Sequence, residues 1–287
     1  MLKQRVITAL VLLAVFLPAL FAPVAAPFLA LTLALIAAAA WEWARLNGLA
    51  GAPALATGLL CAALCAGLWL GGAVARPLPA LWLGMGALWI AGGAWLLRRG
   101  VAGWPRVPLI ARWCAGLAVL TAAWLAMAQA HGMGVNFLLS VLALVWTADI
   151  GAYFAGRALG GRLTHGAKLA RNINPGKSWE GVWGGMAGVL LLAAGWAWLD
   201  DAARPSLFAR LHQAGPLWLA LGALLLAGMS VVGDLAESLV KRSAGMKDSS
   251  GLLPGHGGVL DCIDALLPTL PLVLDYEIGR ASCRERV

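Results

Sequence analysis

Long apolar runs separated by short polar segments dominate the chain. We place membrane-spanning helices near residues 6–22, 25–44, 52–75, 78–97, 109–129, 133–155, 181–199, 215–233 and 259–276. Each run is close to the roughly 20 apolar residues that an α-helix needs to cross a bilayer. Small residues within them, such as Gly184, Gly185 and Gly188, would let helices pack closely. The pattern predicts an all-α, polytopic integral membrane protein with about nine transmembrane helices.

Composition supports the membrane class. The chain of 287 residues is 61% hydrophobic and 12% charged, with a mean hydropathy of +0.83, whereas a soluble domain carries about 25% charged residues. Lys3 and Arg5 ahead of the first apolar run also resemble the start of a signal peptide. A second run follows almost at once, which favours an uncleaved first span.

The distribution of basic residues predicts the orientation. With the N-terminus in the cytoplasm and nine alternating spans, Arg76, Arg204 and Arg210 fall outside. The cytoplasmic side receives Lys3, Arg5, Arg45, Arg98, Arg99, Arg106, Arg112, Arg157, Arg162, Lys168, Arg171, Lys177, Lys241, Arg242 and Lys247. This asymmetry follows the positive-inside rule, so the net charge of +8 reflects topology and indicates no nucleic-acid partner.

Three regions follow from the pattern. Residues 1–132 form N-terminal membrane helices, and residues 133–276 form a C-terminal catalytic region with cytoplasmic loops 156–181 and 234–259. Residues 277–287 break the apolar pattern with Arg280, Arg284 and Arg286. We expect this last segment to be a non-native tail.

The candidate chemistry is concentrated between Gly233 and Asp264. Asp234 with Glu237, and Asp261 with Asp264, are spaced i, i+3 and so share a helix face. The connecting segment is rich in glycine and also contains Asp248 and the basic residues Lys241, Arg242 and Lys247. Carboxylates beside a basic glycine-rich loop favour a phosphate group held next to Mg²⁺. A salt-bridge network among the same charges is the structural alternative.

Three further sites carry weaker signals. Asp149 is a carboxylate inside an apolar run, a functional hypothesis by default, with a pair to Arg157 or to a neighbouring helix as the alternative. Asn174 and Pro175 are typical of an N-cap and first helical residue, which would place Lys177 and Ser178 at an anion-binding helix start. His256 lies between glycines and is assigned at most a phosphate contact.

The segment from Ser238 to Asp264 reads Ser-x-x-Lys-Arg, four residues, Lys-Asp, then Pro-x-His-Gly-Gly-x-x-Asp-x-x-Asp. This order resembles the motif of the phosphatidate cytidylyltransferases (CDP-diacylglycerol synthases). Residues 149–157 and 174–181 resemble two other segments of that family, and the nine-span pattern agrees with it. One departure is Cys262, where the family motif has arginine; Asn174 and Ser178 replace its usual serine and threonine.

The resemblance implies transfer of a cytidylyl group from CTP to phosphatidic acid, giving CDP-diacylglycerol and pyrophosphate, at the cytoplasmic face of a bacterial inner membrane. Mg²⁺ would bind Asp234 and Asp261, with Asp264 as a further ligand, and K⁺ is a second cation that the family implies. The expected catalytic residues are these three acids with Lys241 and Lys247. The expected substrate-binding residues are Asp149, Lys177, Ser178, Ser238, Arg242, Asp248, His256, Gly257 and Gly258.

Partners are expected to be CTP, phosphatidic acid and bilayer lipids, with a homodimer as an option. Two alternatives stay open. One is a related CTP-dependent lipid or polyprenol kinase or cytidylyltransferase. The other is an ion-coupled transporter, because intramembrane acids also line ion paths.

Overall fold

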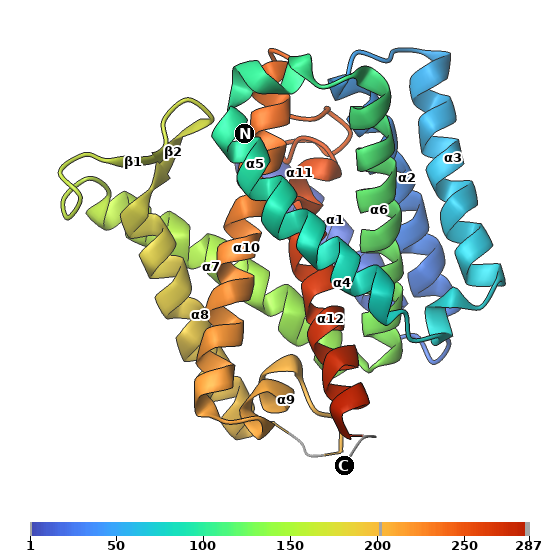
Figure 1. Cartoon of the computed structure of the whole chain (residues 1–287), viewed down its shortest axis with the longest axis vertical. Coiled ribbons are helices and arrows are strands. Elements are labelled where there is room, and N and C mark those ends of the chain that lie inside the picture. The colour runs from blue at the N-terminus through green and yellow to red at the C-terminus, as the bar shows by residue number, and fades with distance from the viewer. Residues whose placement is uncertain (1, 201–202, 285–287) are drawn as a thin grey trace.

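The protein is a bundle of helices with one small sheet at its edge (Figure 1). The structure is a computed structural model that describes residues 2–200 and 203–284. Its α-helices are α1 Leu2–Leu20, α2 Ala26–Leu46, α3 Ala52–Leu70, α4 Pro79–Ala87, α5 Gly93–Arg99, α6 Leu109–Gly132, α7 Val135–Leu159, α8 Trp179–Leu199, α9 Leu207–Gln213, α10 Pro216–Ser243, α11 Leu260–Ile263 and α12 Leu266–Arg284. Short helical turns η1 Ala73–Ala75, η2 Leu88–Gly92 and η3 Val101–Arg106 and strands β1 Lys168–Ala170 and β2 Asn174–Ser178 complete it.

Seven helices in the described ranges are long and apolar enough to cross a membrane. They are Ala26–Leu46, Ala52–Leu70, Pro79–Arg99, Leu109–Gly132, Val135–Leu159, Trp179–Leu199 and Pro216–Ser243. The predicted first and ninth spans correspond to α1, whose apolar part is only Val6–Leu20, and α12. The multi-pass membrane class is therefore supported, whereas the count of nine is not confirmed.

Helix α12 lies in the centre of the molecule. Its residues Leu270, Val273 and Leu274 are buried, and it packs against α4, α6 and α10. The predicted close packing at small residues is confirmed in the α7–α8 pair. A Cβ at Gly185 would lie 2.6 Å from the carbonyl oxygen of Ala148, so only glycine permits this approach.

Polar segments gather at one end of the bundle. The β1–β2 hairpin, α11 and the segment between α10 and α11 lie at the upper end in Figure 1, and α9 lies at the lower end. The residues of the predicted loops 156–181 and 234–259 therefore share one end, away from α9. The second predicted loop is wrong in its start, because α10 continues as helix to Ser243 and carries Asp234, Glu237 and Lys241 on its last turns. Helix α12 continues past Glu277, which accepts a hydrogen bond from Arg210 at 2.7 Å. The non-native tail stays a prediction.

The sequence predicted Asn174 as an N-cap and Pro175 as the first residue of the next helix, and this prediction is wrong. Asn174 pairs with Ala170 as part of the antiparallel β1–β2 ladder, and α8 begins only at Trp179. Its N-cap is Ser178, whose hydroxyl accepts a hydrogen bond from the backbone N–H of Gly181 at 3.2 Å. Asn and Ser are comparable N-cap residues, and the strand pairing decides between them.

Candidate active site

The C-terminal end of α10 carries a buried ion-pair network. The ammonium of Lys241 pairs with Glu237 one turn earlier and with Oδ1 of Asp261 at 2.5 Å. The side chains of Lys241, Glu237 and Asp261 are 12%, 3% and 10% exposed. Charged groups this buried need partners, because an isolated charge away from water is strongly disfavoured. Lys241 therefore fixes α11 to α10.

A second pair joins the hairpin to α10. Lys177 on β2 forms an ion pair with Oδ2 of Asp234, while the hydroxyl of Ser238 donates to Oδ1 of Asp234 at 3.2 Å. Both partners of this ion pair are about a quarter exposed. The structure thus brings Lys177, Asp234 and Ser238 together from two loops that the sequence pattern treated separately.

Two more acids complete the cluster. Asp149 lies within electrostatic reach of Lys177 and Asp234, and Asp264 lies within reach of Asp149, Asp234 and Lys241. The local alternative for Asp149 is not observed, since Arg157 donates instead to the hydroxyl of Tyr153 at 3.1 Å. Five carboxylates therefore face two ammonium groups, which leaves a net negative site at the end of the bundle.

This arrangement partly matches the salt-bridge alternative. Lys241 joins the acids, whereas Arg242 and Lys247 are exposed and form no ion pair in the part of the chain that the structure describes. Asp248 is also exposed. Two basic residues next to the acidic cluster thus remain accessible to an anionic ligand.

The donor set fits a hard divalent cation. Among the side chains that the structure describes, no three His, Cys, Asp or Glu residues form a ready metal-binding group. Mg²⁺, however, commonly takes only one or two protein carboxylates and completes its shell with water and substrate phosphates. The carboxylate oxygens present are of the type that such an ion would bind.

Asp261 also organises the segment between α10 and α11, residues 244–259, which we call the site loop. Its Oδ2 accepts hydrogen bonds from the backbone N–H of Ser249 at 2.9 Å, the Ser249 hydroxyl at 2.8 Å and the N–H of Gly258 at 2.7 Å. Gly257 has φ +86°, a left-handed conformation that favours glycine. The Gly257–Gly258 pair therefore lets the backbone approach the carboxylate.

Sequence reasoning missed Glu42 of α2, which lies under the site loop. It is fully buried and accepts hydrogen bonds from the Ser249 and Ser250 hydroxyls and from the N–H groups of Val259 and Leu260. An acid inside the apolar run 25–44 was the available signal. The N-terminal helices thus contribute directly to the site.

Glu180 was also missed as an anchor. One of its carboxylate oxygens accepts from the N–H groups of Gly161, Leu163 and Thr164 at 3.0, 3.2 and 3.0 Å, and from the Thr164 hydroxyl at 2.7 Å. It holds the turn before β1. The hairpin that carries Lys177 is therefore tied to the start of α8.

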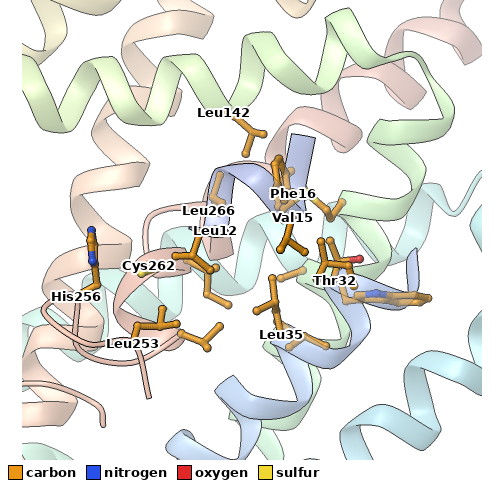
Figure 2. A pocket seen from close by; sticks show the side chains of 18 of the residues that line it. Leu12, Val15, Phe16, Thr32, Leu35, Leu142, Leu253, His256, Cys262 and Leu266 are labelled. Atoms are coloured by element: carbon orange, nitrogen blue, oxygen red, sulfur yellow. The ribbon is translucent and has the colours of Figure 1, made fainter. Parts of the chain in front are cut away.

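One predicted site residue, His256, lines an apolar cavity of about 370 Å³ (Figure 2). Its walls come from α1, α2, α6, α7, the site loop, α11 and α12, with Leu12, Leu35 and Leu266 among them. His256 and Cys262 lie at the site-loop side of this cavity. Cys262 thus faces the cavity, whereas Asp261 faces Lys241.

Comparisons with known proteins bear on the whole chain. Residues 3–276 match the model of the cytidylyltransferase family. A phosphatidate cytidylyltransferase of Pseudomonas aeruginosa is 40% identical over 284 residues, covering 95% of both chains. The enzyme of that name from Haemophilus influenzae is 46% identical over 138 residues, 48% of this chain and 44% of its own. The one from Bacillus subtilis is 35% identical over 140 residues, 49% of this chain and 46% of its own.

Proposed function

Because the chain belongs to the cytidylyltransferase family, we propose that it transfers the cytidylyl group of CTP to phosphatidic acid. An oxygen of the lipid phosphate attacks the α-phosphorus of CTP, the new P–O bond forms, and the bond to the bridging oxygen breaks to release pyrophosphate. The nucleophile is already anionic, so no general base is required. Catalysis then rests on positioning and charge neutralisation.

The observation that carries this proposal is the meeting of acids and lysines from separate segments at one end of the bundle. Asp234, Asp261 and Asp264 would hold Mg²⁺, which would neutralise charge on the triphosphate. The family resemblance adds K⁺ as a second cation. Lys177 and Lys241, now bound to Asp234 and Asp261, stand where they can exchange a carboxylate partner for a phosphate oxygen.

The exposed basic residues beside the acids would bind the phosphate groups of both substrates. Lys247 and Arg242 provide unpaired cations for the triphosphate and the lipid phosphate. The other assigned binding residues are Asp149, Ser178, Ser238, Asp248, His256, Gly257 and Gly258. Of these, Ser178 caps α8 and Gly258 donates to Asp261, so both would act by shaping the site backbone.

The same proposal includes a topology. It counts nine spans, with α1 and α12 added to the seven apolar helices, and an N-terminus and site that would lie in the cytoplasm, where CTP is found. The surrounding membrane would be the inner membrane of a bacterium, with residues 1–132 supporting a catalytic region 133–276. A lipid phosphate at the bilayer interface can reach a site at a helix end while its acyl chains stay in lipid. A homodimer is part of this proposal as a further assembly state.

The experiment is lipid-dependent CTP turnover by the purified chain. Pyrophosphate release that requires both Mg²⁺ and phosphatidic acid supports the proposal. Turnover with a polyprenol instead of phosphatidic acid would identify the related lipid-kinase alternative. Ion transport without CTP consumption would identify the transporter alternative.

A further inference from the structure

Glu42 is a fully buried acid on α2, and hydroxyl and backbone N–H groups surround its carboxylate. Its Oε1 accepts from the Ser250 hydroxyl at 2.5 Å and the Val259 N–H at 3.0 Å. Its Oε2 accepts from the Leu260 N–H at 2.7 Å and lies 3.2 Å from the Ser249 hydroxyl, whose single proton is shared with Asp261. The partners lie 207 to 218 residues away in the chain. One carboxylate therefore joins α2 to the middle of the site loop and to the start of α11.

Glu42 and Asp261 share one partner. The Ser249 hydroxyl lies 3.2 Å from Oε2 of Glu42 and 2.8 Å from Oδ2 of Asp261, and Oδ1 of Asp261 contacts Lys241. A chain of polar contacts thus runs from α2 through Ser249 and Asp261 to Lys241 on α10. Within such a network, the geometry of one member depends on its neighbours.

The backbone fits closely against this carboxylate. A Cβ at Gly258 would collide with the Ser249 hydroxyl and with Oε1 of Glu42. Only glycine lets the loop pass at this distance. Each carboxylate oxygen accepts from one backbone N–H, which cannot rotate away. If glutamine replaced Glu42, its NH₂ group would face one of these N–H groups in either orientation, donor against donor.

From these contacts we propose that Glu42 is a positioning residue for cytidylyl transfer. It holds the site loop so that Asp261 and the Gly257–Gly258 turn keep the positions that cytidylyl transfer requires. The inference rests on the proposed function, and it adds a residue of the N-terminal helices to a site otherwise built from residues 149–264. Glu42 touches no substrate; it acts through the loop.

The test compares Glu42→Gln with wild type, using CTP, Mg²⁺ and phosphatidic acid in detergent micelles. We expect kcat/KM for CTP to fall about 10²-fold, since a misplacement near 1 Å can cost this much, with KM for CTP raised and KM for phosphatidic acid unchanged. Amide hydrogen exchange over residues 249–260 should become faster in the absence of any substrate. Ser250→Ala, which removes one of the four donors, should move both readouts in the same direction by less.

The matched control is Glu277→Gln, which neutralises a largely buried glutamate paired with Arg210 of α9, the helix at the lower end of Figure 1. It should leave both KM values and the exchange of residues 249–260 unchanged. If Glu42→Gln fails to fold, Ser250→Ala carries the test with the same two readouts.

Two results would overturn the inference. One is wild-type kinetics in Glu42→Gln. The other is activity lost only in proportion to the amount of folded protein, with both KM values and loop exchange unchanged, which is the signature of a purely structural acid. Absence of CTP turnover in wild type would instead refute the proposed function, and the exchange measurement would still decide whether Glu42 holds the loop.

Discussion

Removal of the Lys241 ammonium tests the ion-pair network most sharply. In Lys241→Met the shape of the side chain is roughly kept, but Glu237 and Asp261 lose their shared cation. Oδ2 of Asp261 keeps its three loop hydrogen bonds. Glu237, only 3% exposed, keeps no comparable partner. Most of the cost therefore falls on Glu237.

The magnitude follows from burial. Breaking a buried pair by removing one partner costs about 3–5 kcal/mol, whereas replacing the whole pair by apolar groups is often neutral. Lys241→Met should therefore lower the free energy of unfolding by about 3–5 kcal/mol, a change of about two to four powers of ten in the unfolding equilibrium. The double variant Lys241→Met/Glu237→Met should recover most of this loss.

The assay is denaturant-induced unfolding in mixed micelles, followed by tryptophan fluorescence, for wild type, the single variant and the double variant. A Lys241→Met protein within about 1 kcal/mol of wild type, the range of exposed ion pairs, would refute the argument. So would a double variant no more stable than the single one. Either result would mean that the network is more hydrated than its exposed fractions indicate.

Three further predictions concern activity and topology. Asp234→Asn and Asp261→Asn should each abolish lipid-dependent CTP turnover without impairing membrane insertion, and near-normal turnover in both would remove them from the metal role. In a cysteine-free background, a cysteine at 165 or 250 should be labelled only from the cytoplasm and one at 212, an exposed position of α9, only from the other side; reversed labelling would refute the orientation. Cys262→Arg should raise turnover by roughly 10²-fold. Residue 262 faces the apolar cavity, but an arginine there has the length to reach back towards the acids and add a charge-assisted phosphate contact worth about 2–4 kcal/mol; equal turnover of the two proteins would show that this position has no catalytic role.

The helices were predictable because burial in a bilayer depends on composition over about 20 residues. The apolar run 133–155, for example, corresponds to α7, Val135–Leu159. Acids close in sequence, such as Asp261 and Asp264, were also identifiable. Their partners were not all local. Lys177 meets Asp234 across 57 residues, and no spacing rule connects a strand of a hairpin with a distant helix.

Two features needed tertiary information. The hairpin β1–β2 is too short for an alternating pattern to develop, so its strands went unrecognised and Asn174 was mistaken for an N-cap. Glu42 stood out only as an acid between Trp41 and Trp43 in an apolar run. Its role depends on loop N–H groups more than 200 residues away, and only the folded chain brings them together.

The most direct test of the central claim is the fate of the CTP phosphates. Membranes containing the chain are incubated with phosphatidic acid, Mg²⁺ and CTP labelled either at the α- or at the γ-phosphate, with the Asp234→Asn protein as control. Cytidylyl transfer predicts that the α-label enters chloroform-soluble lipid and the γ-label leaves as pyrophosphate, with neither change in the control. Entry of the γ-label into lipid, or no lipid labelling at all, would contradict the account.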